Sequence, residues 1–169
     1  MSSDNPEKWY EKTNLSYYDE IKGQVKGKRY IYTTLLKGTD KENALNIIKE
    51  AHATWGTEMA KQYRQKIPPI TNYNKFKKAM KDGFESMQKN HITFSIKEDS
   101  DEKLEFNVTH CIFAEACKEL DSAELGYAIY CHGDYEYAKA LHPRSRMVRS
   151  KTLMQGDPCC DHTYVWEDE

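Results

Sequence analysis

The sequence predicts an α+β domain in which an antiparallel sheet of two hairpins is flanked by helices. Three observations support this prediction. Apolar residues recur at helical spacing between residues 40 and 88, and they alternate with polar residues between 91 and 108. A second alternation follows two more segments of helical character. The expected order of elements is helices, hairpin, two helices, hairpin.

Composition indicates one globular domain spanning residues 1–169. The chain is 38% hydrophobic and 31% charged, which is globular rather than disordered. A net charge of −2 gives no general attraction to nucleic acid or to an anionic membrane, and no apolar run is long enough to cross a bilayer. The expected partners are a small-molecule substrate or other copies of the chain. The N-terminus lacks the apolar core of a secretion signal, so a cytoplasmic location is expected.

The first half of the chain reads as three helices preceded by a polar stretch, residues 1–12, that is expected to be loosely ordered. The segment from Leu15 to Leu36 favours a helix. Asp40 stands at an N-cap position, and the helix that it begins should end before Pro68. The residues expected to face the core from this second helix are Leu45, Ile48, Trp55, Met59 and Tyr63.

A third helix is expected after a cap at Thr71, followed by the first hairpin. The apolar stripe of that helix comprises Phe76, Met80, Phe84 and Met87. In the hairpin, the residues expected on the buried face are Ile92, Phe94, Ile96, Leu104, Phe106 and Val108.

The last third, residues 105–166, carries the motifs with chemical potential. Helices are expected from Cys111 to Leu120 and from Ala123 to about Leu141. The closing hairpin is expected to pair residues 147–154 with residues 160–166, around a turn at residues 155–158.

The segment CHGDYEY places a thiol, a carboxylate and a phenol on one helical face. Cys131, Asp134 and Tyr135 stand at positions i, i+3 and i+4, which bring their side chains together. This group could act as a nucleophile or as an acid and base. An aspartate on a helix is more often simply solvated, so the local pattern alone favours the plainer interpretation.

In the final strand, a period of two places Cys160 and His162 on one face with Tyr164 and Trp166. The histidine could set the protonation of the thiol, since a thiolate requires a nearby base or cation. The strand by itself favours a core cysteine beside a hydrogen-bonded histidine.

The five cysteines are an odd number and are best interpreted as thiols in a reducing compartment. Zinc is the other use for such residues, but no C-x-x-C pair is present and the adjacent Cys159 and Cys160 face opposite ways. No cofactor or metal is therefore expected. The zinc ligands considered are Cys111, Cys131, His132, Cys160 and His162.

Basic residues precede the turn of the second hairpin in the stretch RSRMVRSK. Such a run is usually solvated, but an arginine directed into a pocket would bind a carboxylate in bidentate fashion. The alternation alone does not fix which arginine this is.

The last third also contains a longer pattern, made of Cys111, Cys131-His132-Gly133-Asp134, Pro143, Lys151-Thr152-Leu153, Gly156 and Cys160-Asp161-His162. This pattern resembles that of the L-2-amino-thiazoline-4-carboxylic acid hydrolase family, and the resemblance is close over about the last sixty residues. The general layout also looks like vinyl-reductase and TRAPP-type domains, in which helices flank an antiparallel sheet.

The resemblance implies hydrolytic opening of a small cyclic amidine thioether to N-carbamoyl-L-cysteine. By the chemistry of this reaction, Asp134 is the preferred general acid or base, and Cys131 or Cys160 would be the nucleophile of a covalent route, with His162 setting the protonation of the thiol. Arg149 is the preferred partner of the substrate carboxylate. Further residues expected near the substrate are Cys111, His132, Tyr135, Lys151 and Thr152.

Two alternatives remain open from the sequence. One is a non-catalytic module of the vinyl-reductase type that holds a small molecule in an apolar pocket, and the other is a zinc-stabilised interaction domain. A hydrolase needs convergent polar groups around a smaller cavity.

Overall fold

A computed structural model describes residues 15–167, so the expectation for residues 1–12 lies outside the described part. Its centre is a four-stranded antiparallel sheet with the strand order β1-β2-β4-β3. The strands are β1 (Ile92–Asp99), β2 (Lys103–Cys111), β3 (Ser145–Val148) and β4 (Cys160–Trp166).

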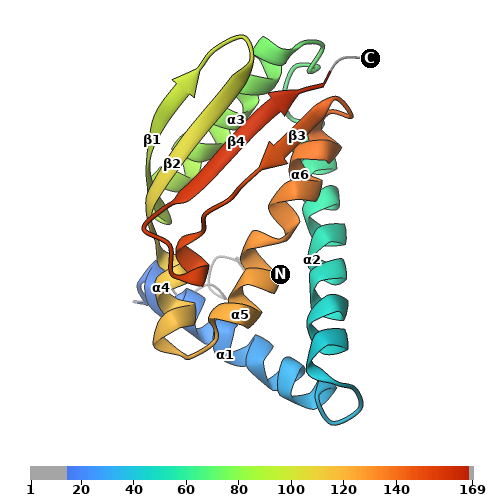
Figure 1. The fold of residues 1–169 in the computed structure, drawn as a ribbon, viewed down its shortest axis with the longest axis vertical. Coiled ribbons are helices and arrows are strands. Elements are labelled where there is room, and N and C mark those ends of the chain that lie inside the picture. Colours follow the sequence, from blue (N-terminus) through green and yellow to red (C-terminus); the bar gives the residue numbers. More distant parts are fainter. Residues whose placement is uncertain (1–14, 168–169) are drawn as a thin grey trace, which may run out of the picture.

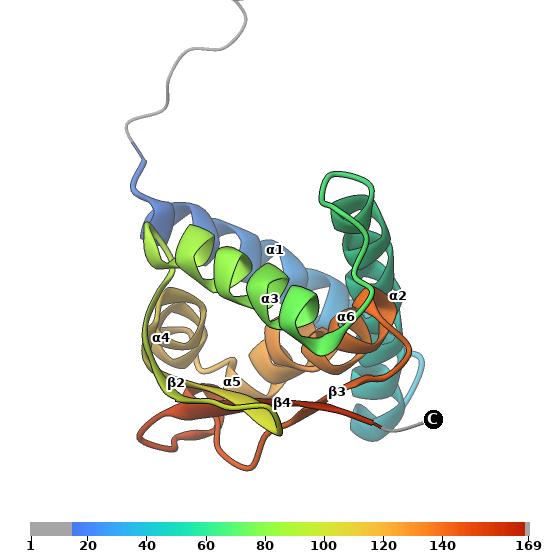
Figure 2. The same ribbon diagram turned by 90° about the horizontal axis from the view of Figure 1, so that it is seen from above.

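The helices lie on one side of this sheet, as the view from above shows (Figure 2). Three precede the first hairpin: α1 (Tyr17–Leu35), α2 (Lys41–Arg64) and α3 (Tyr73–Gln88). Between the hairpins come α4 (Ile112–Glu119), α5 (Ala123–Gly126), the π-helical turn η2 (Tyr127–Cys131) and α6 (Gly133–Leu141), and a 3₁₀ turn η3 (Leu153–Gln155) precedes β4. The α+β class and the predicted order of elements are confirmed (Figure 1). None of the helices between residues 15 and 167 combines the length and the apolar character that a membrane crossing requires.

Side-chain caps explain where two of the helices begin. The carboxylate of Asp40 accepts a hydrogen bond from the backbone N–H of Asn43, as the sequence predicts. The cap of α3 is Asn72 rather than Thr71. The Asn72 side chain accepts from the backbone N–H of Lys75, and Thr71 lies one residue too early to reach that donor.

The core lies between α3 and the covered face of the sheet. Leu104, Phe106 and Val108 are at most 3% exposed, and the ring of Phe84 stacks on Phe106 with 3.9 Å between ring centroids. The predicted alternation therefore holds in β2. It fails near the end of β1, where Ile96 is 44% exposed because the pairing register shifts directly after it.

The packing face of α2 differs from the predicted stripe. Leu45 and Ile48 are buried, but Trp55 is 61% exposed and Met59 is 39% exposed. The contact between α2 and α6 is instead made through small residues, since a Cβ on Gly56 would lie 2.8 Å from the carbonyl oxygen of Gly133. Two backbones that approach this closely leave no room for large side chains between them.

Replacing Gly56 by alanine is expected to lower the free energy of unfolding by about 1–3 kcal/mol, because the new methyl group must push two backbones apart. Gly83→Ala in α3 is the matched control, since nothing lies within 4 Å of its Cβ position. That control should stabilise the protein by about 0.5–1 kcal/mol through helix propensity. Urea unfolding of both variants measures the difference, and equal midpoints would contradict the close contact.

The segment after Ala123 is not one continuous helix. The backbone N–H of His132 donates to the carbonyl oxygen of Tyr127, which is the i+5 pattern of a π turn, so η2 separates α5 from α6. Such a turn inserts one residue and changes which side chains share a face on either side of it.

The predicted strand between Met147 and Met154 is also wrong beyond Val148. The side chain of Asp161 accepts from the backbone N–H groups of Ser150 and Lys151, and Asp157 accepts from that of Thr152. The carboxylates thus bind the backbone N–H groups that would otherwise form hydrogen bonds to a neighbouring strand. The chain instead forms η3 and then reverses at Gly156, whose φ is 100°.

Candidate functional site

Arg149 is the centre of the candidate site. Its side chain is only 2% exposed. One terminal nitrogen, Nη1, donates to Oδ2 of Asp134 at 2.8 Å and lies 3.2 Å from Nε2 of His162. The other, Nη2, donates to the backbone carbonyl of Cys131 at 2.8 Å. One guanidinium therefore joins α6, η2 and β4.

The loop between β3 and β4 directs Arg149 inward. Asp161 accepts from the backbone N–H of Ser150 at 2.9 Å and from that of Lys151 at 2.6 Å, so the two residues that follow the arginine are held to the start of β4. The neighbouring His162 projects from the same strand. Anchoring by Asp161 thus fixes the distance between Arg149 and His162.

Two tyrosines enclose the guanidinium. The central carbon of the Arg149 guanidinium lies 5.7 Å from the ring centroid of Tyr127 and 5.2 Å from that of Tyr135. Burial raises the pKa of Tyr135, and a hydrogen bond to Tyr127 contributes in the same direction. The aromatic faces and this hydrogen bond restrict the arginine to one position.

The carboxyl of Asp134 holds its proton more tightly than an ordinary aspartate does. Burial raises its pKa from 3.8 to about 6, and the charge and hydrogen bond of Arg149 oppose that rise. The side chain remains 37% exposed, so a solvent-borne molecule can reach it. Asp134 is therefore a carboxyl that can exchange a proton at physiological pH.

His162 is neutral in this arrangement. Burial lowers its pKa to about 3, and the charge of Arg149 adds to this effect. Since Nε2 faces an Arg149 donor, it is an acceptor and the proton resides on Nδ1. Within residues 15–167, Nδ1 has no hydrogen-bond partner.

Burial keeps the thiols of Cys111 and Cys131 protonated at neutral pH. Burial raises the pKa of Cys111 to about 11 and raises that of Cys131 further, with the charge of Asp134 adding to the effect on Cys131. The Cys160 sulfur accepts from the backbone N–H of Leu153 at 3.2 Å and lies 3.7 Å from Oγ1 of Thr152. These surroundings suit packed thiols.

The other predicted substrate-binding residues are dispersed around this centre. His132 lies beside Tyr135, with 6.3 Å between ring centroids. Thr152 is 3% exposed and its hydroxyl accepts from the backbone N–H of Met154, which makes it part of the η3 turn. Lys151 is exposed. The structure therefore brings Cys131, Asp134 and His162 together at Arg149 and places Thr152 and Lys151 in the neighbouring loop.

The zinc ligands considered from the sequence are not arranged as a metal site within residues 15–167. In the described range there is no group of three or more histidine, cysteine, aspartate or glutamate side chains arranged to hold a metal ion. Cys160 and Cys111 instead pack in the hydrophobic core, and His162 lies against Arg149.

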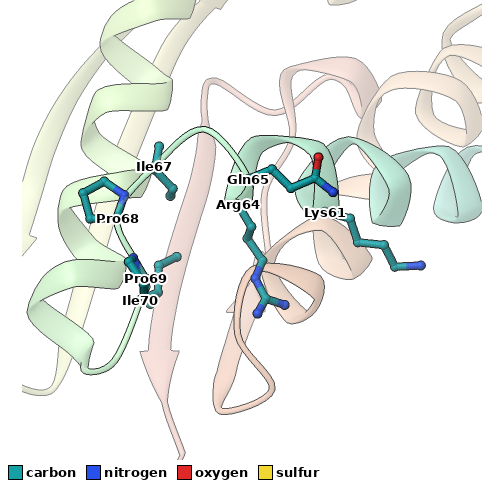
Figure 3. A pocket seen from close by; sticks show the side chains of 7 residues that line it. All are labelled: Lys61, Arg64, Gln65, Ile67, Pro68, Pro69 and Ile70. Atoms are coloured by element: carbon teal, nitrogen blue, oxygen red, sulfur yellow. The ribbon is translucent and has the colours of Figure 1, made fainter.

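Among the cavities of the described part of the molecule, two border α2. One, of about 460 Å³, is at the connection between α2 and α3, and Figure 3 shows its lining, which includes Arg64 and Pro68 but no thiol, carboxyl or imidazole. The other, of about 490 Å³, is lined by Leu45, Lys49, Ala123, Glu124, Tyr127, Met154 and Gln155. Only the second shares a residue, Tyr127, with the surroundings of Arg149.

Sequence reasoning did not identify Tyr127 or Lys49. Tyr127 stands four residues before Cys131 and eight before Tyr135, so helical spacing offered a signal for it. The sequence offered no signal for Lys49, a half-buried residue of α2, because lysines on amphipathic helices are normally solvated.

Several solved structures share the fold of this chain, and two of them are described here. A trafficking protein particle complex subunit 3 from Naegleria fowleri, covalently bound to palmitic acid, has 9% identity and a TM-score of 0.57, with 88% of this chain and 96% of that chain covered. The phenol-responsive sensory domain of the transcription activator PoxR, solved with phenol, has 12% identity and a TM-score of 0.51, with 86% and 74% covered.

A search of curated proteins gave no match. The model of the L-2-amino-thiazoline-4-carboxylic acid hydrolase family matches residues 19–164, a range that includes Asp134, Arg149 and His162. The chain therefore belongs to the L-2-amino-thiazoline-4-carboxylic acid hydrolase family.

Proposed function

We propose that this protein hydrolyses a small cyclic amidine thioether, L-2-amino-thiazoline-4-carboxylate, to N-carbamoyl-L-cysteine. The observation that carries the proposal is the Asp134 carboxyl, which is accessible and held beside Arg149. Its pKa of about 6 suits proton transfer near neutral pH. Family membership supports the substrate class.

The reaction requires one water and one broken carbon–sulfur bond. The water oxygen adds to the amidine carbon of the ring, and the resulting tetrahedral centre collapses with loss of the ring sulfur. The oxygen becomes the carbonyl of the ureido group. One proton from water ends on the ring nitrogen and the other on the sulfur, so the product carries a free thiol.

Asp134 is assigned the proton transfers. As a carboxylate it pairs with a protonated amidine and accepts a proton from the attacking water, and it can return that proton to the departing sulfur. A carboxyl with an ordinary pKa of 3.8 would be a weaker base at neutral pH than one with a pKa of about 6. The raised pKa is thus matched to both steps.

Arg149 and His162 are assigned the task of positioning Asp134. The donors of Arg149 already serve Asp134, His162 and the carbonyl of Cys131, and its side chain is almost fully buried. This occupancy favours a positioning role over direct binding of the substrate carboxylate. His162 accepts from Arg149 and limits the orientations of the guanidinium.

Direct attack by water is preferred to a covalent route through a thiol. A nucleophilic cysteine must be a thiolate, and burial raises the pKa of Cys131 well above its ordinary value of 9.0. Replacing Cys131 by alanine should therefore leave thiol release within about threefold of the unaltered protein, whereas a covalent route predicts a loss of several orders of magnitude.

The test of the function is incubation of the purified, metal-analysed protein with L-2-amino-thiazoline-4-carboxylate, following thiol release and the mass of the product. Catalytic formation of N-carbamoyl-L-cysteine is expected. Failure to form it, with folded protein and the metal content accounted for, would refute the proposed reaction.

A second candidate function is ligand binding without turnover. The two similar structures are described as holding palmitic acid and phenol, and the cavity beside Tyr127 is of a size that accepts a small molecule. Under this alternative the thiazoline would bind and be recovered unchanged. Mass analysis of the recovered compound separates the two functions.

A further inference from the structure

We propose that the region between α1, α2 and η2 is a second binding site, separate from the Arg149 centre, and that it holds the carboxylate of a small molecule. The groups that would bind it are the Lys28 ammonium, the Tyr130 hydroxyl and Nδ1 of His52. Each comes from a different element, since Lys28 belongs to α1, His52 to α2 and Tyr130 to η2. The inference does not depend on the proposed reaction, because none of these residues has a part in it.

Two buried polar atoms in this region lack a hydrogen-bond partner. Within residues 15–167, neither the Tyr130 hydroxyl nor Nδ1 of His52 has one, and both atoms are buried. A buried hydroxyl or ring nitrogen that makes no hydrogen bond destabilises a folded protein, so nearly all such atoms are paired. A polar group bound beside these two atoms would therefore be stabilised.

The Lys28 ammonium lies against the same tyrosine. Its nitrogen is 4.5 Å from the centroid of the Tyr130 ring. Burial lowers the pKa of Lys28, so the charged group itself is partly removed from water. In the described part of the chain, no carboxylate pairs with it. A partly buried cation without a counterion favours binding of an anion.

His52 brings a neutral imidazole to the group. Burial lowers its pKa, and the charge of Lys28 adds to this effect, so the ring is close enough to the ammonium to be influenced by it. A neutral imidazole can carry its proton on Nδ1 and donate it. The backbone of His52 is held in place by α6, because a Cβ on Gly133 would lie 2.9 Å from the His52 carbonyl oxygen.

The three groups favour a compact anion with a single charge. One ammonium offsets one negative charge, and the hydroxyl and the imidazole can each donate one hydrogen bond. A carboxylate has two oxygens with lone pairs enough for all three donors, whereas a phosphate dianion would keep one charge uncompensated. The surroundings are otherwise apolar, since the Tyr130 ring packs against two hydrophobic clusters and lies 4.8 Å from that of Phe113.

The backbone of η2 joins this site to the Arg149 centre. Tyr130 is followed by Cys131, whose carbonyl oxygen accepts from Nη2 of Arg149. The charge of Asp134 does not shift the pKa of Lys28 or of Tyr130, although it does shift that of the adjacent Cys131. A carboxylate held by Lys28 and Tyr130 is thus a bound ligand and not a molecule that reacts at Asp134.

The test uses sodium acetate as the probe and compares melting temperatures with those in sodium chloride at equal ionic strength. Acetate at ten times its Kd, obtained from the saturation of the effect, should raise the melting temperature of the unaltered protein by about 3–6 °C. Lys28→Met and Tyr130→Phe should each remove this rise. Lys26→Met should keep it, because Lys26 is an exposed lysine of the same helix.

Tyr130→Phe also tests the unpaired hydroxyl without any ligand. Loss of a buried hydroxyl that has no partner should leave the melting temperature in chloride unchanged or raise it. A fall in chloride would mean that the hydroxyl is already paired, and would overturn the proposal.

The acetate series has its own contrary outcomes. The site is overturned if acetate has no effect on the unaltered protein, or if all three variants keep the rise. A larger rise with inorganic phosphate, lost in Lys28→Met, would overturn the assignment of a carboxylate. None of these outcomes bears on ring opening, which thiol release measures.

Discussion

Replacing Asp134 by asparagine is expected to reduce kcat/KM for ring opening by about 10²- to 10⁴-fold, the range for loss of a general acid or base. Asparagine keeps the size of the side chain and can still accept from Arg149, so the fold and the position of the arginine should be retained. Steady-state thiol release measures the effect. The neighbouring Glu136→Gln removes a carboxylate from the same helix and should leave the rate nearly unchanged.

The same carboxyl predicts the pH dependence of the unaltered protein. Because the ionised form accepts the proton from water, kcat/KM should fall about tenfold for each pH unit below the pKa of about 6. This acidic limb should be absent from the residual activity of Asp134→Asn. A limb that persists in the variant would assign the ionisation to another group and contradict the role of Asp134.

Replacing Arg149 by methionine is expected to lower the free energy of unfolding by about 2–4 kcal/mol, somewhat less than for a fully buried pair because 37% of the Asp134 side chain is exposed. The loss arises because Asp134, His162 and the carbonyl of Cys131 lose one common donor. Activity should fall too, since Asp134 is no longer positioned. Urea unfolding monitored by circular dichroism measures the stability.

The Arg149→Met effect should grow with pH. Burial already raises the pKa of Asp134 above its ordinary 3.8, so the unfolded chain loses this proton first and stability falls as pH rises from about 4 to 6. Without the opposing charge of Arg149 the folded pKa rises further, and the fall continues to higher pH. Arg146→Met is the control, because its partner Glu167 is exposed and the pair contributes only about 0–1 kcal/mol. Equal losses in both variants at all pH values would contradict the central role of Arg149.

Much of the fold could be predicted from the sequence, because periodicity and caps are local signals. The hairpin of β1 and β2 and the start of α2 at Asp40 were fixed by patterns of a few residues. The exposure of Trp55 could not be predicted from α2 alone. It depends on the close approach of Gly56 to Gly133, which are 77 positions apart in the sequence.

The candidate site was predictable in its residue types but not in its connections. Helical spacing placed Cys131 and Asp134 on one face, and strand alternation selected His162. The sequence only favoured Arg149 among several arginines. Its direction depends on Asp161, which binds the backbone of Ser150 and Lys151 and so keeps them out of the predicted strand. The cavity with Lys49 combines segments from α2, α5, η2 and η3, and no local pattern encodes such a combination.

The strand order has a consequence for how the protein forms during synthesis. β4 lies between β2 and β3, although it follows both in the chain. Until β4 has been made, through residue 166, β2 can pair only with β1. Arg149 likewise lacks its contact with the imidazole of His162, which lies in β4. A nascent chain that ends before this point exposes an unpaired strand flank, which favours association with other chains. Assembly of the sheet and assembly of the candidate site thus both wait for β4.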